Sequence, residues 1–138
     1  MRIKKRLMSF GILSVIVMML VSGCEKTSVE QTKLSIQRTQ WSEMGSAELA
    51  PIVSTPLTQG DVLYDDDFAK IKIKSVDENR IVLTVKGCMV EPKDNGAIDM
   101  RAKPKKKIEL ECGQSIELVS QSMDFGVNLL ISYEQNQP

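Results

Sequence analysis

The sequence FAKIKIKSVDENRIVLTVKG, residues 68–87, decides the fold class of this protein. Its first half alternates lysine with small or β-branched apolar residues, and its second half alternates in the same way around Ile81, Leu83 and Val85. Alternation with period two is typical of a β-strand that buries one face and exposes the other. The polar run at residues 77–79 separates the halves, so the stretch predicts two antiparallel strands joined by a hairpin turn.

The same alternation returns towards the C-terminus. The apolar residues expected to share a face are Ile108, Leu110, Cys112, Ile116 and Leu118, and then Val127, Leu129, Ile131 and Tyr133. We find no convincing amphipathic helix after Asp61. Short strands at regular intervals predict that residues 61–138 form an all-β domain, either a small antiparallel β-sandwich or a partly open barrel.

The N-terminal residues have a different character. A basic segment at residues 1–6 precedes a mostly apolar run at residues 7–21, and two small residues follow that run. These are the parts of a secretory signal peptide, which we expect to be helical. The apolar run is shorter than the ~20 residues that span a bilayer comfortably. We therefore assign residues 1–23 to a signal peptide that is removed from the mature chain.

The apolar run ends in Val21-Ser22-Gly23-Cys24, which resembles the lipobox of bacterial lipoproteins. In that family a diacylglyceryl group is attached to the cysteine sulfur, and a peptidase cuts before the cysteine. The resemblance implies cleavage between Gly23 and Cys24 and a lipid anchor on Cys24. It places the protein at the cell membrane, outside the cytoplasm. The alternatives are an uncleaved signal anchor and an ordinary secretory signal with a chance cysteine.

Residues 24–60 are expected to be the lipidated cysteine and a flexible tether with some ordered elements. Residues 25–40 are rich in Glu, Lys, Thr, Ser and Gln, and such a composition buries too little apolar surface to offset chain ordering. Pro51 and Pro56 favour an extended edge segment, and a short helix remains open within residues 40–50. Trp41 is expected to pack on the edge of the domain.

The charge balance argues against nucleic acid as a partner. The chain has 18 basic and 18 acidic residues, and residues 1–23 carry four of the basic residues and no acid. The mature chain therefore has 14 basic and 18 acidic residues, a formal net charge of −4. A mildly acidic exported domain offers no electrostatic reason to bind nucleic acid.

The chain contains no histidine, which is the commonest general base and metal ligand. No serine or cysteine therefore has a histidine to activate it, and we predict neither enzyme activity nor a metal or cofactor. The acidic run at residues 65–67 could bind a hard cation, but only Asp65 and Asp67 share a side of an extended chain. We interpret the run as a solvated turn.

Cys88 and Cys112 are the other two cysteines of the chain, and an even pair in an exported protein suggests a disulfide. Two buried free thiols are the alternative. Tyr64, Met123, Asp124 and Phe125 are candidates for lining a small groove, although ordinary loop packing explains them as well.

Basic residues gather around Pro104. They are Arg101, Lys103, Lys105, Lys106 and Lys107, and they could contact an anionic surface or polymer. The alternative is a solvated hairpin loop that discourages edge pairing. The first functional hypothesis is a membrane-anchored β-domain that binds or assembles with an envelope protein, for instance through an exposed strand edge. The second is a module that binds an anionic polymer or ligand through residues 101–107.

Overall fold

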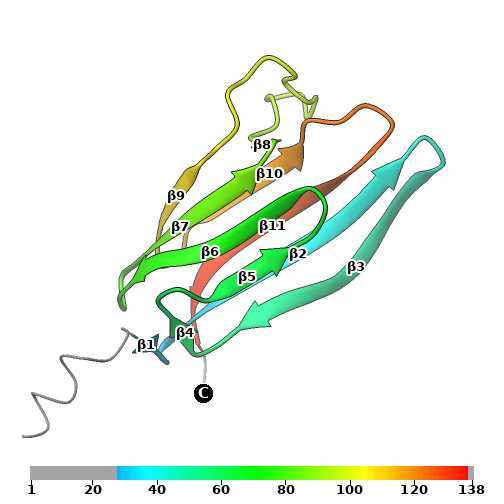
Figure 1. Ribbon diagram of the computed structural model, residues 1–138. Coiled ribbons are helices and arrows are strands. Elements are labelled where there is room, and N and C mark those ends of the chain that lie inside the picture. Colours follow the sequence, from blue (N-terminus) through cyan, green and yellow to red (C-terminus); the bar gives the residue numbers. More distant parts are fainter. Residues whose placement is uncertain (1–27, 137–138) are drawn as a thin grey trace, which may run out of the picture.

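The computed structural model describes residues 28–136, which form an all-β sandwich of two main antiparallel sheets (Figure 1). The predicted all-β class is confirmed, and no helix occurs within these residues. The five-stranded sheet has the order β3 (Gly45–Ser54), β2 (Thr32–Ser42), β11 (Phe125–Gln135), β10 (Ser115–Ser120), β8 (Met89–Val90). The four-stranded sheet has the order β5 (Val62–Asp65), β6 (Ala69–Val76), β7 (Arg80–Gly87), β9 (Lys107–Glu111). A short pair, β1 (Ser28–Val29) and β4 (Leu57–Thr58), stands beside them.

The predicted hairpin at residues 68–87 is confirmed as β6 and β7. Ile71 lies opposite Val85 in the antiparallel ladder. The turn is closed by Asp77, whose carboxylate accepts backbone N–H groups from Asn79 at 2.7 Å and Arg80 at 2.8 Å. These donors stabilise the charged carboxylate and lower the pKa of Asp77.

The core lies between the two sheets and is built from the alternating positions of both. The fully buried large side chains include Leu34, Ile36, Ile71, Ile73, Ile81, Leu83, Leu118, Leu129, Ile131 and Tyr133. The predicted inward faces of β6, β7 and β11 are therefore confirmed. Val82 is also buried although it alternates out of phase with these residues.

The prediction of a flexible tether over residues 24–60 is wrong for residues 28–60. β2 lies inside the five-stranded sheet, paired with β11 from Thr32 to Ser42 and with β3 on its other side. The helix left open within residues 40–50 is instead the β2–β3 hairpin. The alternation of β2 is weak in the sequence, because only its N-terminal half buries large apolar residues, Leu34 and Ile36.

Pro51 lies in β3, which is an edge strand of the five-stranded sheet, as its sequence context predicted. The ladder with β2 shifts register between Ile36 and Arg38, so Ala50 and Pro51 together lie opposite a single residue of β2. This is a β-bulge. The Arg38 guanidinium donates to the Ala50 carbonyl through Nε at 3.1 Å and through an NH2 group at 2.6 Å. The interrupted ladder therefore keeps a partner for that carbonyl.

Tyr133 joins the two sheets. Its side chain is fully buried on β11, and its hydroxyl donates to the backbone carbonyl of Asp77 in the β6–β7 turn. The Thr32 hydroxyl, at the start of β2, lies 2.8 Å from the same phenol oxygen. Since the single phenol proton goes to Asp77, the Thr32 hydroxyl is the donor in the second bond. Burial raises the pKa of Tyr133.

None of the described residues belongs to a helix that is long and apolar enough to cross a membrane.

We expect Tyr133→Phe to lower the free energy of unfolding by about 1–3 kcal/mol, because the Asp77 carbonyl and the Thr32 hydroxyl lose their partner. Urea denaturation measures the change. Ser132→Ala, on the opposite face of the same strand, is the matched control and should change stability by less than ~0.5 kcal/mol. Equal effects of the two substitutions would contradict the role of the phenol.

A chain that begins at Asp61 lacks β2 and should not fold. β11 would lose its longest neighbour, and the inner faces of β11 and β6 would lose Leu34, Ile36 and Leu57. A chain that begins at Ser28 keeps every described strand and should unfold cooperatively on heating. Circular dichroism compares the two, and cooperative melting of the shorter chain would restore the predicted boundary at residue 61.

Candidate functional site

The best candidate site lies at the end of the sandwich remote from Ser28, here called the distal end (Figure 1). β2 begins at Thr32, close to the first described residue, and its 11 residues end at Ser42. A strand rises about 3.3 Å per residue, so β2 extends roughly 35 Å from the near end to the distal end. The β2–β3, β5–β6 and β10–β11 turns bring side chains together there.

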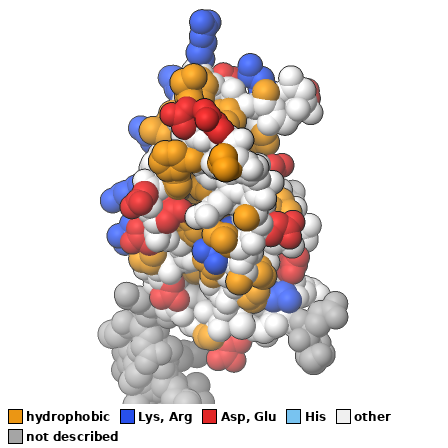
Figure 2. Space-filling view, turned by 90° about the vertical axis from the view of Figure 1, so that its right-hand side faces the viewer, with side chains coloured by type: hydrophobic (Ala, Val, Ile, Leu, Met, Phe, Trp, Pro, Cys, Tyr) orange, Lys and Arg blue, Asp and Glu red, His pale blue; other side chains and the backbone are white. Residues whose placement is uncertain are grey.

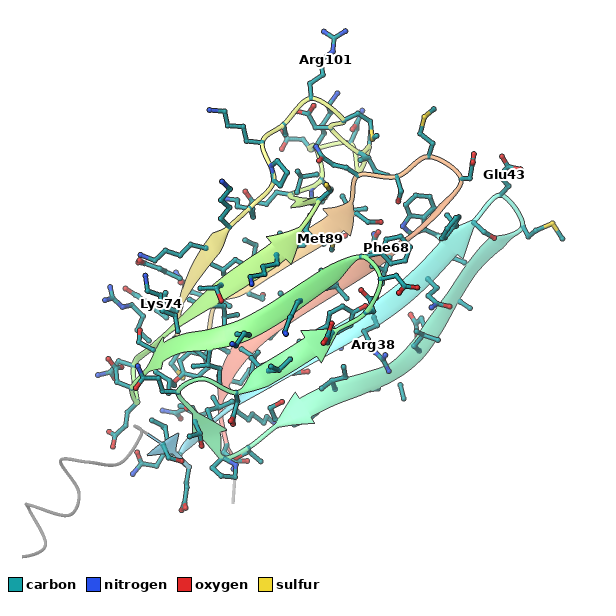
Figure 3. The ribbon with its side chains drawn as sticks, in the orientation of Figure 1. Arg38, Glu43, Phe68, Lys74, Met89 and Arg101 are labelled. Carbon is teal, nitrogen blue, oxygen red and sulfur yellow. The ribbon has the colours of Figure 1, made fainter. Side chains whose placement is uncertain are left out.

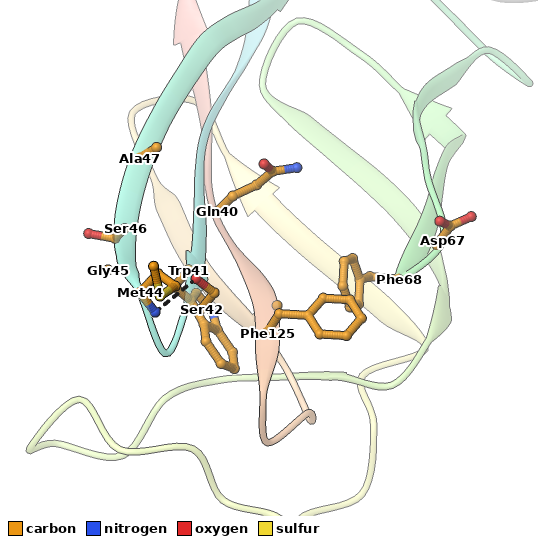
Figure 4. Close-up of a pocket in the computed structure, with 11 residues that line it drawn as sticks. Gln40, Trp41, Ser42, Met44, Gly45, Ser46, Ala47, Asp67, Phe68 and Phe125 are labelled. Carbon is orange, nitrogen blue, oxygen red and sulfur yellow. Dashed lines mark hydrogen bonds between the residues drawn. The ribbon is translucent and has the colours of Figure 1, made fainter.

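A groove of about 550 Å³ opens between the β2–β3 hairpin and the β5–β6 turn (Figure 4). The residues that line it are Gln40, Trp41, Ser42, Met44, Gly45, Ser46, Ala47, Asp67, Phe68, Phe125 and Gly126. It is called the distal groove below. The five-stranded sheet supplies most of this lining, while Asp67 and Phe68 come from the turn before β6. The groove therefore lies where the two sheets diverge.

Phe68 and Phe125 form an aromatic pair across the two sheets. Their ring centroids are 5.7 Å apart and the rings are inclined at 71°, an edge-to-face arrangement. Such pairs are favoured by the ring quadrupoles. Phe125 remains 62% exposed although it packs on Phe68. The pair therefore closes the core at the distal end and offers an aromatic surface to solvent at the same time.

Trp41 packs against the backbone at Gly126, its partner in the β2–β11 ladder. A Cβ atom on Gly126 would lie 2.4 Å from Cζ2 of Trp41 and 2.2 Å from Oγ of Ser120, so only glycine fits. The indole Nε1 is buried and has no hydrogen-bond acceptor among residues 28–136. The prediction that Trp41 packs on the domain is thus refined: it belongs to a central strand.

Exposed methionines extend the apolar surface beyond the aromatic pair. Met44 is 97% exposed at the β2–β3 turn, and Met123 is 83% exposed in the β10–β11 turn. Asp67 is the only charged residue in the lining, while Glu43 and Asp124 lie in the β2–β3 and β10–β11 turns, next in sequence to residues that line the groove. Figure 2 shows acidic side chains directly beside hydrophobic ones in its upper half. The distal end therefore combines apolar and acidic side chains.

The acidic run at residues 65–67 organises the β5–β6 turn. The Asp66 carboxylate accepts the backbone N–H groups of Phe68 at 2.7 Å and Ala69 at 2.9 Å. The Tyr64 hydroxyl donates to the same carboxylate, and burial together with this bond raises the pKa of Tyr64.

Tyr64 is buried and does not line the distal groove, whereas the predicted candidate Phe125 does. Among the described residues no group of three or more His, Cys, Asp or Glu side chains could hold a metal ion.

The predicted Cys88–Cys112 disulfide is wrong, because both cysteines are free. Arg80 lies opposite Glu111, so Cys112 follows β9 at the start of β7, whereas Cys88 follows the end of β7. Eight residues of extended chain separate these positions by roughly 26 Å, far beyond the ~7 Å limit for a disulfide. The alternative of two buried thiols is wrong too, since Cys88 is exposed and Cys112 is half-buried.

The predicted basic residues lie on a long connection between the two sheets and at the start of β9. The chain from residue 91 to residue 106 connects β8 in one sheet to β9 in the other, so it is no hairpin loop. Lys105 pairs with Glu91 at 3.4 Å, and Lys107 with Glu109 at 3.1 Å. Arg101 points away from the body of the domain at the tip of the loop (Figure 3). Lys105 and Lys107 thus have acidic partners, whereas Arg101 extends from the tip of the loop.

Gly23, Cys24 and the predicted signal peptide lie outside the described residues. No protein-family model matches this chain, and no curated protein or solved structure matches it significantly.

Proposed function

We propose that this protein is a membrane-anchored lipoprotein whose β-domain binds a protein of the cell envelope at the distal groove. The observation that carries the proposal is the exposed apolar surface around that groove, at the end of the domain farthest from the proposed anchor. The lipobox resemblance at residues 21–24 supports the anchor.

The proposed anchor and the distal groove lie at opposite ends of the domain. Cys24 precedes Ser28 by four residues, which span at most roughly 15 Å. A lipid on Cys24 would therefore hold the near end of the sandwich close to the bilayer. The long axis of β2 then carries the distal groove away from the lipid, where it can meet another protein.

The apolar surface at the distal end is the reason to expect a protein partner. Met44, Met123 and Phe125 are all more than half exposed and lie on neighbouring turns. Methionine and aromatic side chains are enriched at protein interfaces, and contiguous exposed apolar patches mark such sites. Asp67 lines the groove, with Glu43 and Asp124 on the adjoining turns, so the complementary partner offers an apolar side chain flanked by lysine or arginine.

Replacement of the anchor tests the first half of the proposal. We expect Cys24→Ala to move the processed domain from the membrane fraction to the soluble fraction, because one or more acyl chains are lost. Intact mass measurement of the wild-type mature protein should find a diacylglyceryl group on Cys24. An unmodified thiol there, or a processed Cys24→Ala chain that stays wholly in the membrane fraction, would disprove the anchor.

Site-directed photo-crosslinking in the native envelope tests the second half. A photoreactive residue at position 125 should give a discrete protein adduct, whereas the same residue at position 33, near the opposite end of β2, should not. The crosslinked peptide should contain an apolar residue flanked by lysine or arginine, and Asp67→Lys should abolish the adduct. Indistinguishable adducts from positions 125 and 33, or an adduct that Asp67→Lys leaves intact, would rule out the distal groove as the binding site.

A further inference from the structure

The outer face of the four-stranded sheet is basic. The inward positions Ala69, Ile71 and Ile73 of β6 are buried, so the lysines between and after them lie on the outer face. Val85 of β7 is buried, and its neighbour Lys86 lies on the outer face as well. We call this surface the lysine face, and it consists of Lys70, Lys72, Lys74 and Lys86. Figure 3 marks Lys74 on it.

The strand register brings these charges together. Lys70 lies directly opposite Lys86, where side chains are about 5 Å apart at Cβ. Lys72 and Lys74 continue the row along β6 at intervals of roughly 7 Å. Figure 2 shows Lys and Arg side chains along its left margin, the side of the four-stranded sheet. Four positive charges thus lie on one face of the sheet, which also carries Lys107, Glu109 and Glu111 on β9.

These lysines are not neutralised by ion pairs. Within residues 28–136 the ion pairs join Lys33 to Glu134, Arg80 to Glu109, Lys105 to Glu91, and Lys107 to Glu109. Glu109, on the same outer face, pairs with Lys107 and Arg80. The hydrogen bond and charge of Lys107 and the charges of Arg80 and Lys74 lower the pKa of Glu109, so Lys74 has one acidic neighbour. Asp65 is the other neighbour of Lys70 in the ladder, yet no ion pair joins the two.

Stability does not account for this arrangement. Like charges that lie directly opposite each other in a sheet destabilise it, and an acidic residue at either position would be more favourable. The lysine face therefore costs stability in the isolated domain, as surfaces selected for binding often do.

We propose that the lysine face binds an anionic phosphate polymer. Ammonium groups bind phosphate oxygens as point charges, and a row of them suits an extended chain of anions. The face is the broad side of the sandwich, parallel to the strands that lead away from Ser28. The lysine face is therefore open to a polymer that runs alongside the domain. The proposed bilayer lies at a different place, at the end of the sandwich near Ser28. This site is separate from the distal groove and does not depend on a protein partner.

The test uses the full mature chain in neutral detergent, with long-chain inorganic polyphosphate as the probe and fluorescence anisotropy as the readout. We expect Lys86→Glu to weaken binding at least about fivefold, since each lysine near a polyanion contributes on the order of one charge contact. Its melting temperature should stay equal or rise, because Lys70 gains an acidic partner. Lys86→Arg should retain binding.

Lys33→Glu is the matched control, since it makes the same charge change on the five-stranded sheet and should leave affinity within about twofold. An equal loss in both variants would show a general charge effect and overturn the proposal. Absence of polyphosphate binding would overturn it as well. Preferential binding to phosphatidylglycerol vesicles over polyphosphate, lost in Lys86→Glu, would assign the face to a membrane and overturn the polymer. Failure at this face leaves the crosslinking at position 125 unaffected.

Discussion

The hydrogen bonds of the Tyr133 phenol hold three distant parts of the chain together: the start of β2, the end of β11 and the β6–β7 turn. They lie at the near end of the sandwich, in a fully buried position. At the opposite end the rings of Phe68 and Phe125 pack against each other across the two sheets, and Phe125 stays largely exposed. A buried polar link thus rigidifies the near end, whereas the distal end presents apolar side chains to solvent.

The fold class could be predicted from residues 68–87 and 127–133 because each buries one face of a strand, and burial imposes period two on the sequence. β2 could not be predicted, because the other sheet covers little of its distal half. Arg38 and Gln40 therefore occupy inward positions where apolar residues would have indicated a strand. The distal groove was only partly predictable. Phe125 was a candidate, but its contact with Phe68 joins residues far apart in sequence, and only tertiary structure brings such residues together.

The distribution of charge on the surface also depends on tertiary structure. Composition alone described a mildly acidic domain, and the run at residues 101–107 looked like its one basic feature. The fold gives Lys105 and Lys107 of that run acidic partners, and the strand register gathers Lys70 and Lys86 from different strands into a second basic surface. Acidic groups collect at the distal groove instead. A net charge close to zero thus conceals two surfaces of opposite sign, each suited to a different kind of partner.

The β-bulge in β3 matters at the open edge of the five-stranded sheet. An uninterrupted ten-residue edge would present a continuous row of amides and carbonyls to a second copy of the chain, and such a row is a template for intermolecular pairing. Pro51 has no amide hydrogen to donate, and the register shift at Ala50 and Pro51 breaks the regular spacing of the strand. A neighbouring molecule therefore finds no regular template for intermolecular sheet growth along β3.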